Sequence, residues 1–92
     1  MNKEEFIKLF NTLKEYQNME NNIYEASNGA FDLGAMPAAA NLFHHCVSFM
    51  CDYNDNLIDG LYELIIDGSV SFNNNEVVNT PERFYELAFM EE

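Results

Sequence analysis

The chain has 92 residues, and its sixteen Asp and Glu against four Lys and Arg give a formal net charge of −12. This charge excludes direct binding to nucleic acid or to anionic membranes, because phosphates would repel it. Since 48% of the residues are hydrophobic, with eight Phe and five Tyr, the sequence predicts one folded domain over residues 1–92 rather than a disordered acidic tail.

The N-terminal segment predicts a helix over residues 3–27. Apolar side chains recur there at helical spacing, and Asn28-Gly29 is a natural stop because both residues tolerate the left-handed conformation. Residues 30–36 are expected to connect this helix to the next. The apolar face consists of Phe6, Leu9, Phe10, Leu13 and Tyr16.

Pro37 suits the first turn of a second helix, and the apolar register then continues for about thirty residues. The segment reads either as one helix over residues 37–66 or as two nearly collinear helices, 37–53 and 55–66. Asn54 and Gly60 are its weak points. One helix would measure about 45 Å, too long for so small a domain, so the chain must bend near 54–60 or pack against a second copy. We therefore also predict a homodimer.

Asp67-Gly68 either ends this helix or forms the turn of a small hairpin over residues 64–72. Residues 73–79 are expected to be a loop. Thr80 and Pro81 then supply a cap and a first helical residue, which predicts a terminal helix over residues 81–91. The expected fold is all-α, a small bundle of three to four helices.

Residues 15–82 contain no Lys or Arg but eleven carboxylates, and five of these share one helical face. On a continuous helix the five would extend over about 22 Å, and neighbouring like charges would each cost about 0.2–0.5 kcal/mol. This arrangement is typical of a phosphate mimic that occupies a basic channel. The alternative is a solvated helix face. The predicted partner-binding residues are Asp52, Asp55, Asp59, Glu63, Asp67 and, beside them, Tyr62.

Tyr62 suits recognition of arginine by stacking, although a half-buried tyrosine at the helix boundary is the alternative. No nucleotide-binding or nucleophile motif is present, so we expect no catalysis. Residues 52–63 place oxygen ligands as a calcium loop does but lack its glycine, and His44-His45-Cys46 has the wrong spacing for zinc. The sequence therefore predicts no metal and no cofactor.

Cys46 and Cys51 lie too far apart around a helix to pair, so both are expected to be free thiols. With no signal peptide or apolar span in the sequence, we expect the protein in the cytoplasm of a bacterial cell.

In size and charge the whole chain resembles the small acidic inhibitors that phages and mobile elements encode, among them anti-CRISPR proteins and DNA-mimic anti-restriction proteins. Members of this class share no common sequence or fold, so no functional residue carries over. The resemblance implies a non-catalytic inhibitor that binds a basic nucleic-acid-binding protein, such as a nuclease or a CRISPR effector. Two alternatives are an immunity protein or antitoxin that neutralises a basic nuclease toxin, and a structural or regulatory subunit that binds through an apolar helix face.

Overall fold

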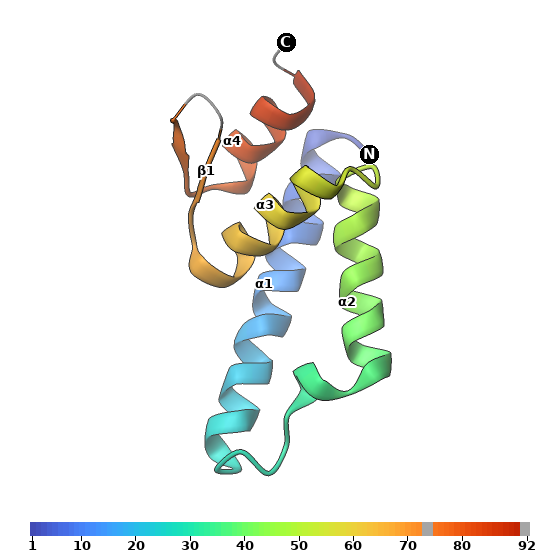
Figure 1. Cartoon of the computed structure of the whole chain (residues 1–92), viewed down its shortest axis with the longest axis vertical. Helices are drawn as coiled ribbons and strands as arrows, with labels where there is room; N and C mark the ends of the chain where they lie inside the picture. The colour runs from blue at the N-terminus through green and yellow to red at the C-terminus, as the bar shows by residue number, and fades with distance from the viewer. Residues whose placement is uncertain (73–74, 91–92) are drawn as a thin grey trace.

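Helices dominate the computed structural model, which describes residues 1–72 and 75–90. The elements in chain order are α1 (Lys3–Ala26), the 3₁₀-helix η1 (Leu33–Ala35), α2 (Pro37–Met50), α3 (Asp55–Asp67), β1 (Val70–Ser71), β2 (Val77–Val78), α4 (Pro81–Tyr85) and the π-helix η2 (Glu86–Met90). In Figure 1, α1 and α2 run along the long axis, and α3, the two strands and α4 gather at one end. The molecule measures 46 × 23 × 22 Å. The all-α prediction is confirmed, with a two-stranded sheet added.

Both ends of α1 follow the local sequence. The Asn2 side chain accepts a hydrogen bond from the Glu5 amide at 2.8 Å, and the Glu5 carboxylate accepts one from the Asn2 amide, which completes a capping box. Asn28 and Gly29 then adopt positive φ angles of 52° and 83°, which ends the helix. The predicted range of 3–27 differs from the observed helix by one residue.

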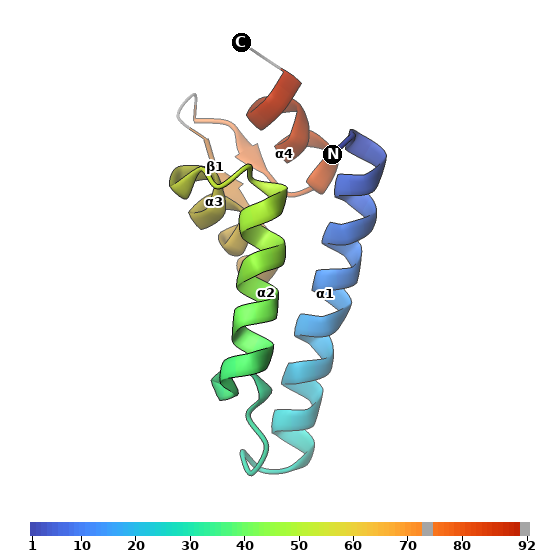
Figure 2. The ribbon, with the colours of Figure 1, turned by 90° about the vertical axis from the view of Figure 1, so that its right-hand side faces the viewer.

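The chain breaks between α2 and α3, so the single helix over residues 37–66 is wrong. Asp52 and Tyr53 have φ angles of 52° and 59°, and the Tyr53 amide donates to the Ser48 carbonyl at 2.9 Å. Asn54 then caps α3 by accepting from the Asn56 and Leu57 amides. The two helices are also not collinear: α3 is steeply inclined to α2 in Figure 1 and points away behind it in Figure 2. Asn54 is therefore the N-cap of α3 and not a member of the apolar face of one long helix.

The hairpin lies further along the chain than residues 64–72. Helix α3 continues to Asp67, and Gly68 ends it with a φ of 86°. The strands β1 and β2 pair antiparallel, with Val70 opposite Val78. Residues 73–74 of the predicted loop and residue 91 of the predicted last helix lie outside the described residues. Thr80 caps α4 as predicted, by accepting from the Arg83 amide.

The core lies at the end where α1, α3, the sheet and α4 meet. Phe84 is fully buried and stacks on Phe6, with ring centroids 6.0 Å apart. Gly60 of α3 faces this ring, and a Cβ there would lie 3.4 Å from the Phe84 side chain, an ordinary contact distance. The buried residues of α1 are Phe6, Phe10 and Leu13, and those of α2 are Val47, Ser48 and Met50.

Three of the four basic residues serve this fold. Lys14 of α1 donates to the backbone carbonyl of Ile65, in the last turn of α3. That turn contains no basic residue of its own, and it forms the negative end of the helix dipole. Lys14 therefore satisfies a terminal carbonyl and brings a positive charge to an acidic helix.

Replacing Lys14 with methionine should lower the free energy of unfolding by about 1–2 kcal/mol, because Ile65 loses a charged donor. Lys8→Met is the matched control, since Lys8 is exposed on the same helix and loses the same charge. Its effect should stay below about 0.5 kcal/mol. Urea unfolding followed by circular dichroism measures both variants. Equal losses would mean that Lys14 acts through net charge alone.

The other two basic residues bind carboxylates near the chain ends. Arg83 donates to both oxygens of Glu76 and, at 3.2 Å, to Glu86. Lys3 of α1 pairs with the second oxygen of Glu86. The hydrogen bond from Arg83 lowers the pKa of Glu76, and those from Lys3 and then Arg83 lower the pKa of Glu86. These pairs join the start of α1 to the end of the chain.

Acidification should remove the stabilisation from these pairs. A carboxylate whose pKa falls on folding stabilises the fold above its unfolded pKa, and this contribution is lost as the pH falls through the folded pKa. The difference in unfolding free energy between the wild type and Arg83→Gln should therefore shrink from about pH 6 to about pH 3. Urea midpoints across this range measure it. The difference for the exposed-site control Lys8→Gln should stay nearly constant; a parallel loss there would contradict the assignment.

Candidate partner-binding surface

Four of the predicted carboxylates lie on one face of α3, and all four side chains are exposed. They recur every fourth residue, so successive charges lie about 6 Å apart along the helix axis and the set extends over about 18 Å. We call this set the acidic row. It consists of Asp55, Asp59, Glu63 and Asp67.

The acidic row stands on a firmly held helix. The opposite face of α3 is buried in the core through Ile58, Leu61, Leu64 and Ile65. Asn54 satisfies amides at its start, and the Gly68 amide bonds the Leu64 carbonyl at its end. Because both ends are capped and one face is packed, the backbone positions that carry the carboxylates are held at fixed spacing.

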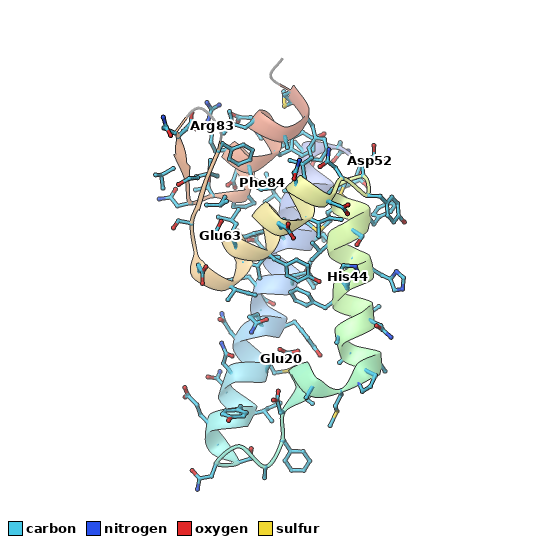
Figure 3. The ribbon with its side chains drawn as sticks, in the orientation of Figure 1. Glu20, His44, Asp52, Glu63, Arg83 and Phe84 are labelled. Carbon is cyan, nitrogen blue, oxygen red and sulfur yellow. The ribbon has the colours of Figure 1, made fainter. Side chains whose placement is uncertain are left out.

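The structure corrects the placement of two predicted residues. Asp52 does not continue the acidic row, because it lies in the turn before α3 with a positive φ angle. Figure 3 shows Asp52 at this turn and Glu63 further along α3. Tyr62 is half-buried and stacks on Phe43, with ring centroids 5.7 Å apart. Tyr62 is therefore a half-buried tyrosine at the helix boundary, and its ring is not an open surface for stacking.

A short polar chain joins α2 to α3 beside Tyr62. The Tyr62 hydroxyl lies 3.0 Å from Nδ1 of His44, and Nε2 of His44 lies 3.4 Å from the Ser48 hydroxyl. Burial raises the pKa of Tyr62, so it stays protonated at neutral pH. Ser48 is only 5% exposed. This arrangement fixes the crossing of the two helices and offers no accessible nucleophile.

One of the two cysteines, Cys51, has little reactive character. Cys51 is fully buried, and burial raises the pKa of its thiol to about 12. Cys46 is half-buried, and both thiols are free. Because the thiolate is the reactive form, Cys51 behaves as a small core residue.

A pocket that the sequence did not predict lies between the end of α2 and the helices α4 and η2, beside Met1. Its volume is about 320 Å³. Aromatic rings and one carboxylate dominate its walls. Phe49 was the available signal, because it belongs to neither the apolar nor the acidic face predicted for residues 37–66. We call this the aromatic pocket; it is lined by Met1, Phe49, Met50, Asp52, Tyr53, Tyr85 and Phe89.

A second hollow, of about 220 Å³, runs between α1 and α2. Leu42 at its edge is 68% exposed, and Tyr16 meets Phe43 across it with ring centroids 6.1 Å apart. Its lining is almost entirely apolar. We call it the α1–α2 groove; it is lined by Leu9, Thr12, Leu13, Tyr16, Ala39, Leu42, Phe43 and Cys46.

Within residues 1–72 and 75–90, no group of three or more His, Cys, Asp or Glu side chains is placed to bind a metal ion. In the same residues, no helix combines the length and apolar character that crossing a membrane requires. Comparisons with protein-family models, curated proteins and solved structures find no significant match.

Proposed function

We propose that this protein is a non-catalytic inhibitor that binds the basic nucleic-acid-binding surface of a bacterial nuclease or CRISPR effector. The observation that carries the proposal is the acidic row, with four exposed carboxylates on one capped helix that has no basic residue. Their spacing of about 6 Å is similar to that of backbone phosphates along a nucleic-acid strand. Arg and Lys side chains that bind phosphates would therefore bind this face through charge-assisted hydrogen bonds.

The energetic cost of the acidic row supports a binding role. Its three neighbouring pairs, at spacing i, i+4, each destabilise the helix by about 0.2–0.5 kcal/mol. Asp55 recovers part of this cost, since it lies in the first turn, where a negative charge is favourable. Asp59 and Glu63 have no such compensation from the helix dipole. Cations of a partner would relieve this repulsion. Because α3 has no basic residue of its own, that relief would add to the binding free energy.

Reversing Asp59 and Glu63 together to lysine should abolish binding, while Asp55 stays in place to stabilise the helix start. Affinity capture from a bacterial lysate, read by mass spectrometry, identifies the partner, and a nucleic-acid mobility shift then measures competition. Wild-type protein should displace the nucleic acid, and the displacement should weaken steeply between about 50 and 200 mM salt.

The matched control reverses Glu25 and Asp32, which are exposed and lie away from α3, so that net charge changes equally. Circular dichroism must show unchanged helix content in both variants. Equal loss of competition in the two variants would mean that net charge, and not the acidic row, determines binding. Competition that survives reversal of Asp59 and Glu63 would remove the basis of the proposal.

The α1–α2 groove favours a second candidate, an apolar interface that joins two copies of the chain. Exposed Leu42 beside a groove with almost no polar lining is the kind of surface that usually contacts a partner. Two chains of charge −12 repel each other, and salt screens this repulsion. Self-association would therefore strengthen with salt, whereas binding through the acidic row would weaken.

Sedimentation velocity at rising salt concentration tests this interface. A dimer should form as salt is raised, and Leu42→Ser should weaken it by about a hundredfold, because each of the two copies loses a buried apolar side chain. Val77→Ser is the matched control, since Val77 is a similarly exposed apolar residue on β2. A wild-type protein that stays monomeric at every salt concentration would exclude the interface.

A further inference from the structure

We propose that the aromatic pocket binds an arginine side chain of the basic partner. The inference deepens the proposed function and rests on it in one respect, because both require a positively charged protein partner. The pocket adjoins the turn that leads into α3, so one partner surface can meet the pocket and the acidic row together. A volume of about 320 Å³ is at the small end for ligand pockets, which suits a single side chain.

The walls of the aromatic pocket supply aromatic rings on which a guanidinium group can stack. Tyr85 and Phe89 lie with their ring centroids 5.1 Å apart, and buried Phe6 packs against both rings from the core side. Phe49 and Tyr53 are 57% and 68% exposed, so much of their ring surface is open to a partner. Arginine stacks on aromatic faces more readily than lysine does, because its charge is planar and less strongly hydrated.

The electrostatic environment of the pocket also favours a cation. Asp52 lines it, and within the described residues the Asp52 carboxylate makes no hydrogen bond or ion pair. Helix α2 ends at the pocket with Phe49 and Met50, which places the negative end of its dipole there. The Met1 carbonyl, which accepts from the Tyr85 hydroxyl at 3.1 Å, provides a further acceptor at the same wall.

The turn that presents two of these residues is costly for the fold. Asp52 and Tyr53 are consecutive non-glycine residues with positive φ angles, a conformation that a bulky side chain rarely adopts. A turn selected for stability alone would use glycine or asparagine at these positions. An acid and an exposed aromatic there provide the charge and the stacking surface that a guanidinium needs.

Titration of ¹⁵N-labelled protein with the capped peptide Gly-Arg-Gly tests the assignment. Saturable shift changes should concentrate at Phe49, Asp52, Tyr53, Tyr85 and Phe89. The lysine peptide should bind more weakly, and the citrulline peptide, which keeps the shape without the charge, should not bind. Asp52→Asn and Tyr53→Ala should each weaken arginine binding by about tenfold. Asparagine tolerates a positive φ angle, so Asp52→Asn keeps the turn and the fold.

Two controls separate the pocket from its surroundings. Glu25→Gln removes one equivalent charge from an exposed position outside both the pocket and the acidic row, and it should leave the affinity of the arginine peptide unchanged. Met1 lines the pocket, so a variant extended by Gly-Ser ahead of Met1 moves any α-ammonium group away from the pocket wall and should bind the peptide at least as well. Loss of binding on this extension, or equal binding of the citrulline peptide, would overturn the assignment.

The outcomes also distinguish this inference from the proposed function. Shift changes confined to the acidic row, abolished by Asp59→Asn and unaffected by Asp52→Asn, would overturn the pocket and leave the inhibitor proposal intact. Arginine binding in the pocket, together with competition that survives reversal of Asp59 and Glu63, would support the pocket and overturn the role of the acidic row.

Discussion

Electrostatic repulsion among its own carboxylates is the constraint on which the rest of this structure depends. With sixteen acids and four bases, compaction brings like charges together, and a small apolar core must offset the cost. Three of the four bases are accordingly placed where they act on the fold: Lys14 at the end of α3, and Lys3 and Arg83 between the start of α1 and residues 76–86. The long uninterrupted acidic stretch is tolerable because its cations come from outside it.

The acidic row and the aromatic pocket have the same energetic character. In each, groups that cost the isolated protein stability are held in place by neighbours that contribute it. The row rests on the buried face of α3, and the pocket rests on Phe6, through Tyr85 and Phe89. A partner that supplies positive charge would gain from both without reorganising the backbone that carries these rings and carboxylates.

The sequence predicts the local structure better than the tertiary arrangement. Asn28-Gly29, Pro37 and Thr80-Pro81 identify helix ends by their own chemistry, and the acidic row follows from spacing within one helix. The break at residues 51–54 is predicted only as one of two alternatives, because the apolar register continues across it, although Asn54 is a strong cap. Asp67-Gly68 suits a helix end and a hairpin equally, so only packing decides between them. The aromatic pocket needs Met1, Phe49 and Phe89 to converge, which no local pattern encodes.

The elongated shape has a consequence for how the molecule opens. Every residue from Lys14 to Ala26, and from Pro37 to Cys46, is exposed or half-buried, whereas the core gathers at the opposite end. The far ends of α1 and α2 are thus held mainly by their own backbone hydrogen bonds and a few aromatic contacts. Their amide protons should exchange through local openings that cost far less than global unfolding. We therefore expect the far ends of α1 and α2 to open before the end of the molecule that carries the acidic row and the aromatic pocket.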